Sequence, residues 1–108
     1  MIGTIFRFMD EVLEIRVIGK DVIFRSSKFG SQFVTIKELR LDKKGVLREH
    51  PDLEGRSDWR QVAIDRFREK IKKLETEKKR MDYIIDDLQK FGYVPVAQQK
   101  IGFRAKKL

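Results

Sequence analysis

The stretch that decides the fold is VLEIRVIGKDVIFR, residues 12–25. Its first half alternates between apolar and charged residues, which is the period of a strand with one buried face. The apolar residues on that face are Leu13, Ile15 and Val17. Gly19-Lys20 then places glycine first in a two-residue loop, which is typical of a type II′ turn, and residues 22–25 return as the partner strand. The sequence therefore predicts an antiparallel hairpin.

Further β-prone segments flank this hairpin. Residues 5–8 form a short run before it, and residues 32–41 alternate again after a second turn. The tetrapeptide Asp42-Lys43-Lys44-Gly45 fits a type I turn with glycine in the left-handed position, and Val46-Leu47 then begins a last short strand. We therefore predict an antiparallel meander of about four or five strands across residues ~4–50.

The segment HPDLEG, residues 50–55, ends this region. Pro51 cannot donate a hydrogen bond to a sheet and favours an extended His50. Asp58, followed by Gln61 three residues later, resembles a capping box at the start of a helix. His50 is the single histidine, and histidine suits proton transfer or metal binding. Because no cysteine or second histidine accompanies it, we interpret this segment as a strand-to-helix connection.

The period changes to that of a helix after Asp58. One stripe of apolar residues consists of Trp59, Ala63, Ile64, Phe67, Ile71 and Leu74. A second stripe consists of Met81, Ile84, Ile85, Leu88 and Phe91. Thr76 is a suitable N-cap between them, and Gly92 is a suitable stop. We predict two amphipathic helices, ~58–74 and ~77–91, with a single bent helix as the alternative and residues 93–97 as a final strand.

These elements predict an α+β fold, in which the N-terminal meander packs against the two C-terminal helices. At 108 residues, the chain fits one domain, residues 1–96, followed by a basic C-terminal tail, residues 97–108. The absence of asparagine and the 39% of charged residues favour a thermostable protein. No signal peptide and no apolar run of ~20 residues is visible, so we expect a cytoplasmic protein without a membrane segment.

Motifs for chemistry are missing. The lack of cysteine excludes disulfides, thiol nucleophiles and thiolate metal sites. No phosphate-binding glycine motif or nucleophile elbow occurs. Asp82 and Asp86 share a helix face and could hold Mg²⁺, but Lys78 and Lys90, each four residues away from one of them, indicate ordinary salt bridges. We therefore expect no enzyme activity, no metal or cofactor and no small-molecule substrate.

The positive charge is unevenly distributed. Residues 1–55 carry ten basic and nine acidic side chains, whereas residues 56–108 carry fifteen and eight, and no acid follows Asp87. An uncompensated positive field attracts polyanions. The candidate nucleic-acid contacts are Lys79, Arg80, Lys100, Phe103, Arg104, Lys106 and Lys107. Phe103 is included because aromatic rings stack on single-stranded bases. The sequence thus favours a non-enzymatic accessory that contacts nucleic acid electrostatically.

An alternative is a homo-oligomeric protein-interaction or scaffold module. Eight phenylalanines are many for a small core, and both faces of residues 22–25 are apolar. A sheet with two apolar faces needs cover on both sides. Two helices cover one face, and the other is free to pack on a second copy. A homodimer is therefore the competing prediction.

Overall fold

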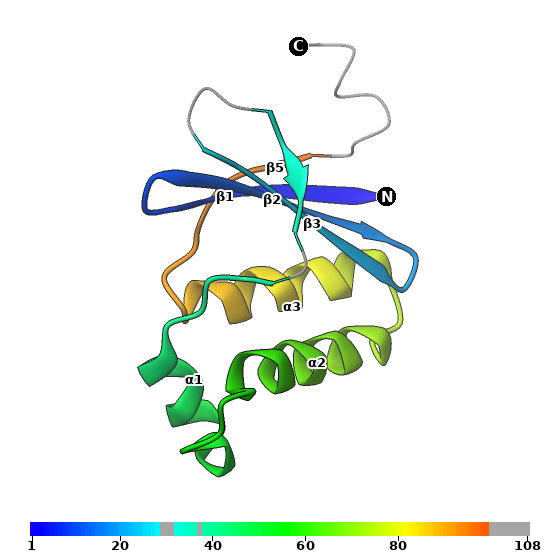
Figure 1. Cartoon of the computed structure of the whole chain (residues 1–108). Coiled ribbons are helices and arrows are strands. Elements are labelled where there is room, and N and C mark those ends of the chain that lie inside the picture. The colour runs from blue at the N-terminus through cyan, green and yellow to red at the C-terminus, as the bar shows by residue number, and fades with distance from the viewer. Residues whose placement is uncertain (29–31, 37, 100–108) are drawn as a thin grey trace.

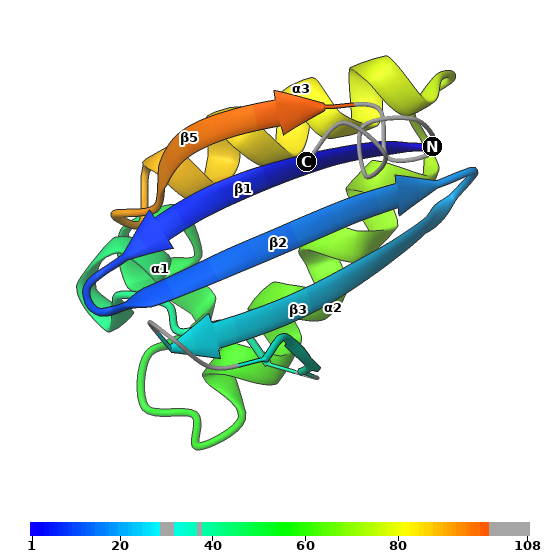
Figure 2. The same ribbon diagram turned by 90° about the horizontal axis from the view of Figure 1, so that it is seen from above.

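A computed structural model of the chain describes residues 1–28, 32–36 and 38–99 (Figure 1). Its described part is a mixed α+β structure in which one antiparallel sheet has the strand order β4-β3-β2-β1-β5. The strands are β1 Ile2–Phe8, β2 Glu11–Ile18, β3 Asp21–Lys28, β4 Val34–Thr35 and β5 Val94–Gln99. The helices are α1 Lys43–Glu49, α2 Trp59–Lys72 and α3 Glu77–Gln89. The helices lie on one side of the sheet, and the other side of the sheet carries none of them (Figures 1 and 2).

The predicted hairpin is confirmed. Strands β2 and β3 pair from Glu11 opposite Lys28 to Ile18 opposite Asp21. Gly19, the first residue of the connecting turn, has a φ of 59°, which costs a glycine little. The preceding turn, between β1 and β2, places Met9 at a φ of 57°, where a side chain is strained. The meander is therefore joined by two tight turns, of which only the second has a glycine.

The core fills the space between the sheet and the helices. Phe6, Ile15 and Phe24 are buried side chains from three adjacent strands. The facing buried residues of the helices are Ala63, Ile64, Phe67, Ile71, Met81, Ile84 and Leu88. Both stripes expected from the sequence thus face the sheet, which explains why two amphipathic helices form here.

The two predicted helices are confirmed as α2 and α3, and the single bent helix is wrong. Thr76 caps α3, because its Oγ1 accepts a hydrogen bond from the Lys79 N–H at 3.1 Å. The capping box at Asp58 is also wrong. Arg56 donates two hydrogen bonds to the Asp58 carboxylate, and Gln61 donates to Asp65 instead of closing the box.

Residues 42–49 correct the prediction of a third hairpin. They form helix α1, capped by Asp42, whose carboxylate accepts a hydrogen bond from the Gly45 N–H at 3.0 Å. Gly45 is needed for space, since a Cβ atom there would lie 3.1 Å from Cδ1 of Phe91. Val46 is fully buried as a helical residue and belongs to no strand. Asp42 and Gly45 are typical turn residues, but here Asp42 caps a helix and Gly45 packs against Phe91.

The strand predicted over residues 32–41 is also shorter in the structure. Only Val34–Thr35 pairs with β3, and the Ile36 N–H donates to the Phe24 carbonyl at 2.9 Å. The final strand is confirmed as β5, which pairs with β1 and completes the sheet. Among the residues that the structure describes, no helix combines the length and the apolar character needed to cross a lipid bilayer.

Candidate nucleic-acid interface

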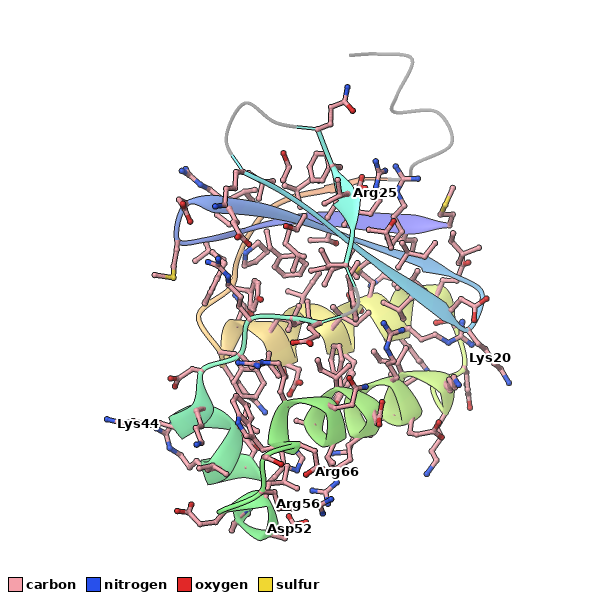
Figure 3. The ribbon with its side chains drawn as sticks, viewed as in Figure 1. Lys20, Arg25, Lys44, Asp52, Arg56 and Arg66 are labelled. Atoms are coloured by element: carbon pink, nitrogen blue, oxygen red, sulfur yellow. The ribbon has the colours of Figure 1, made fainter. Side chains whose placement is uncertain are left out.

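The side of the sheet away from the helices carries three arginines on three adjacent strands. They are Arg7 on β1, Arg16 on β2 and Arg25 on β3. Their sequence neighbours point into the core, so alternation turns the arginines outward. Figure 3 shows Arg25 on this side of the molecule. We call this surface the arginine face; it also includes Glu14 and the aliphatic residues Ile5, Val12 and Ile23.

A single carboxylate organises two of these arginines. Arg16 Nε and Arg25 Nη1 donate to Glu14 Oε1 at 3.1 and 3.2 Å, and Glu14 is only 6% exposed. The Arg25 guanidinium also lies over the Phe33 ring, 5.5 Å from its centroid. Both arginine side chains remain partly accessible, at 27% and 31% exposure. They are therefore held in place while still reachable from solvent.

Arg7 adds a charge with no compensation in the described residues. It is exposed, and no acid in the described chain forms an ion pair with it. It lies opposite Val12 on one side and Val94 on the other. Arg7, Arg16 and Arg25 thus place three positive charges on this side of the sheet, against Glu14 and the exposed Asp21 at the start of β3. This arrangement attracts an anion.

The basic run at the α2–α3 junction is largely compensated. Lys79 Nζ lies 3.4 Å from Glu75 and Lys78 Nζ lies 3.1 Å from Asp82. Such exposed ion pairs are weak, so Lys79, with a side chain 61% exposed, remains available to a phosphate.

Arg80 must be removed from the set of candidate contacts. It is 5% exposed, and its guanidinium donates to the Leu74 carbonyl through Nε and Nη2 and to the Gly19 carbonyl through Nη1. All three bonds join parts of the fold. The reason for the error is that helical periodicity did not reveal that this position faces the β2–β3 turn.

The remaining predicted contacts, Lys100, Phe103, Arg104, Lys106 and Lys107, lie outside the described residues. The structure does fix where this segment is attached. Gln99 pairs with Gly3, and Gly3 pairs with Arg16, so the three residues form one row across the sheet. With strands ~4.8 Å apart, the attachment point lies about 10 Å from the Arg16 backbone. The basic tail therefore starts beside the arginine face.

Sequence reasoning missed the arginine face, although alternation carried its signal. Arg16 lies between two buried residues of its strand, and Arg7 and Arg25 each follow a buried phenylalanine. The pairing register then brings the three arginines onto one face of the sheet. Counting charges in the two halves of the sequence does not reveal this register.

Comparisons with known proteins add no function. No family model, no curated protein and no solved structure matches this chain. In the described ranges, no three acidic or histidine side chains gather closely enough to hold a metal ion. The interface must therefore be judged on its own geometry.

Proposed function

We propose that the protein is a non-enzymatic cytoplasmic accessory that binds nucleic acid electrostatically, through the arginine face and the basic tail. The observation that supports the proposal is the outward projection of Arg7, Arg16 and Arg25 around the single carboxylate of Glu14. Guanidinium groups bind phosphate through paired N–H donors. Four further cations follow Gln99 in the sequence, and Gln99 itself pairs with Gly3 on β1.

The aliphatic part of the arginine face favours single strands. Ile5, Val12 and Ile23 lie between the arginines and are partly exposed. Exposed bases contact such an apolar surface, whereas a duplex offers mainly its backbone. We therefore expect a single strand to bind more tightly than a duplex of the same length.

A homodimer through the same face is the second candidate. Val34, Val94 and Val96 are exposed at 60%, 57% and 51% near the two edges of the sheet. A two-fold interface, however, places a surface against its own copy. It would therefore bring two sets of uncompensated arginines together, which disfavours association. Light scattering with gel filtration tests this alternative, and a stable dimer that persists in the arginine variant below would support it.

The proposal is tested by fluorescence anisotropy with labelled single-stranded and duplex oligonucleotides at several salt concentrations. The variant Arg7→Gln/Arg16→Gln/Arg25→Gln removes three charges from the arginine face. The matched control, Lys44→Gln/Arg48→Gln/Lys73→Gln, removes three exposed charges from the helical layer. Each lost phosphate contact lowers the slope of log K against log salt by about 0.7 to 0.9, so we expect a loss of about 2 to 3 in the first variant.

The control should keep most of the affinity and nearly all of the slope. A chain ending at Gln99 measures the contribution of the tail separately. The triple arginine variant could lose stability because it leaves Glu14 unpaired. In that case the same comparison is made with the single variants Arg7→Gln and Lys44→Gln, at positions without an ion pair in the described chain. The proposal fails if the wild-type protein does not bind at low salt, or if both triple variants lose affinity equally.

A further inference from the structure

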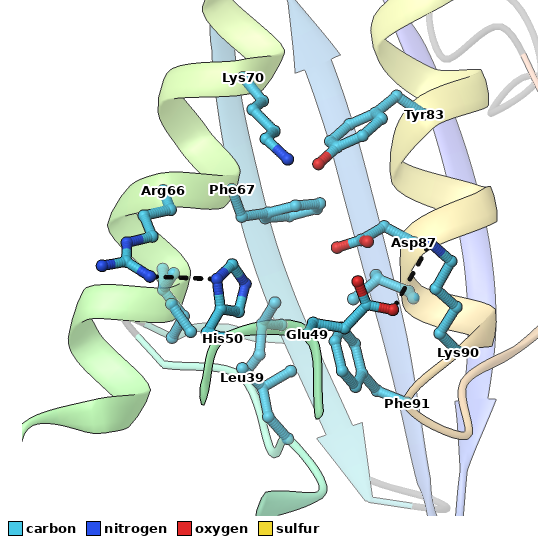
Figure 4. Close-up of a pocket in the computed structure, with 14 residues that line it drawn as sticks. Leu39, Glu49, His50, Arg66, Phe67, Lys70, Tyr83, Asp87, Lys90 and Phe91 are labelled. Carbon is cyan, nitrogen blue, oxygen red and sulfur yellow. Dashed lines mark hydrogen bonds and ion pairs between the residues drawn. The ribbon is translucent and has the colours of Figure 1, made fainter. Parts of the chain in front are cut away.

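A cavity of about 150 Å³ opens among α1, α2 and α3 (Figure 4). It lies in the helical layer, whereas the arginine face is on the other side of the sheet. Its apolar lining consists of Leu39, Leu41, Ala63, Ile64, Phe67, Leu88 and Phe91. A cavity of this volume accommodates one benzene-sized ring. The size and lining therefore fit a single aromatic ring that packs on Phe67.

The histidine presents a defined donor to this cavity. Arg66 Nη1 lies 3.1 Å from His50 Nδ1, and a guanidinium can only donate. Nδ1 must therefore accept, which leaves the ring proton on Nε2. Figure 4 shows the second ring nitrogen of His50 turned toward the cavity. His50 thus offers an N–H to a ligand. It does not lie in a strand-to-helix connection as the sequence predicted, since it ends α1 and precedes a short 3-10 helix at Pro51–Leu53.

Two polar groups of α3 reach the same space without a satisfied partner. Tyr83 and Asp87 are one helical turn apart and both line the cavity. In the described part of the chain, the Tyr83 hydroxyl and the Asp87 carboxyl form no hydrogen bond and no close ion pair, although the Tyr83 ring lies 5.8 Å from the Phe67 ring. Burial raises the pKa of the Asp87 carboxyl above its ordinary value and raises that of Tyr83 to about 12. Both side chains are partly buried, so a ligand in the cavity can replace water as their hydrogen-bond partner.

The charges around the cavity are balanced. Arg66 pairs with Asp52 at 2.6 Å, and Lys90 lies 3.8 Å from Glu49. This leaves Lys70 and Asp87 as one positive and one negative group at the lining. A cationic ligand would be repelled by the lysines and the arginine, and an anionic one by the two carboxyls. An uncharged ring with both donor and acceptor groups fits this lining.

We propose that the cavity binds an uncharged single-ring heteroaromatic molecule of the pyrimidine nucleobase class. The ring packs on Phe67, its amino or imino group donates to Asp87, and its carbonyl and ring-nitrogen acceptors receive bonds from Lys70 and His50. Carboxylates accept from the cytosine amino group in known base recognition, and lysine donates to base acceptors. The site is independent of the arginine face, since no residue is shared between them.

The test measures binding of free cytosine and uracil by saturation-transfer NMR and calorimetry. Benzoate and benzylamine serve as anionic and cationic rings of the same size. Small ligands of eight heavy atoms with good contacts reach a Kd of about 0.1 to 1 mM, which is the result expected for the pyrimidines. The proposal is overturned if neither pyrimidine binds at about 10 mM, or if benzoate or benzylamine binds more tightly than both.

A matched pair of variants tests the role of the carboxyl. Asp87→Asn should weaken pyrimidine binding at least about tenfold, because it replaces one carboxylate oxygen with an NH2 donor and leaves a single, neutral acceptor for the ring amino or imino group. Asp86→Asn, a neighbouring exposed carboxylate outside the cavity, should leave the Kd unchanged. Equal affinity in the wild-type and Asp87→Asn proteins would overturn the assigned contact. The arginine-face triple variant should bind cytosine normally, so failure of the nucleic-acid proposal and failure of this one are distinguishable.

Discussion

Replacement of Arg80 by alanine is the sharpest test of the structure, because the sequence and the structure assign this side chain opposite roles. A surface cation that binds phosphate can be truncated without loss of stability. The structure instead buries Arg80, whose guanidinium donates three hydrogen bonds to two carbonyl groups of the fold. Its guanidinium connects the α2–α3 junction at Leu74 to the β2–β3 turn at Gly19.

The expected loss of unfolding free energy in Arg80→Ala follows from the carbonyl groups that lose their hydrogen-bond donor. Truncation leaves the Leu74 and Gly19 carbonyls without their donor, at about 1 to 3 kcal/mol each. Gly19 is exposed and Leu74 is half-buried, so water can reach both and the lower value applies. Loss of the packed aliphatic stem adds about 1 kcal/mol. We therefore expect Arg80→Ala to lower the free energy of unfolding by about 3 kcal/mol, or the melting temperature by about 12 to 15 °C.

The assay is urea unfolding followed by circular dichroism, combined with the anisotropy titration. Arg80→Lys keeps the charge but can satisfy fewer acceptors, so it should lose about 1 to 2 kcal/mol. Lys79→Ala, the exposed neighbour, should change stability by less than about 0.5 kcal/mol. At temperatures where Arg80→Ala is folded, its salt slope of nucleic-acid binding should equal that of the wild type. A stable Arg80→Ala protein with a reduced slope would refute the buried assignment.

Four further predictions concern local features. Met9→Gly should stabilise the protein by about 0.5 kcal/mol, because relief of the left-handed backbone strain at Met9 (about 1 to 2 kcal/mol) exceeds the entropy cost of glycine. Gly19→Ala should destabilise the protein by about 1 kcal/mol, because alanine would carry a side chain at the same positive φ. Urea midpoints measure both changes. Thr76→Ala should cost about 1 kcal/mol in the same assay, since the Lys79 N–H loses its cap. Burial raises the pKa of the Asp87 carboxyl above 3.8 in the folded protein. The contribution of this protonation to the free energy of unfolding is complete below pH 3.8, and it is lost as the pH rises through the folded pKa. The stability advantage of Asp87→Asn over wild type should thus grow from about pH 4 to pH 7 in thermal melts, and a constant difference would contradict the assignment.

Patterns that depend on one element could be predicted from the sequence. The β2–β3 hairpin, both long helices and the Thr76 cap follow from local periodicity and side-chain chemistry. The α1 segment could not be predicted in the same way. An aspartate with a glycine three residues later, as at Asp42 and Gly45, is compatible with the start of a helix and also with a turn. In the structure Phe91 packs closely over Gly45, a contact between residues far apart in the chain that no local pattern shows.

The site was harder to predict than the fold, because charge in a sequence does not show which charges are paired. The run around Lys79 drew attention by its density, yet nearby acids compensate most of it. Arg7, Arg16 and Arg25 are separated by nine residues each and are unremarkable in a linear reading. Only the pairing register places them on one face. The cavity likewise draws its lining from three helices and a connecting segment that no local motif joins.

The distribution of charge between body and tail gives the two parts of the proposed interface different physical roles. Residues 56–99 carry eleven basic and eight acidic side chains, whereas residues 100–108 carry four basic ones and no acid. The last nine residues of the tail, 100–108, therefore hold half of the net charge of +8. Such a concentrated field acts over about one Debye length, ~8 to 10 Å in physiological salt, which is close to the distance from its attachment point to Arg16. If the proposed function holds, we expect the tail to govern the rate of encounter with a polyanion. The arginines fixed by Glu14 would then set where the polyanion rests, because only ordered donors impose a geometry on a bound phosphate.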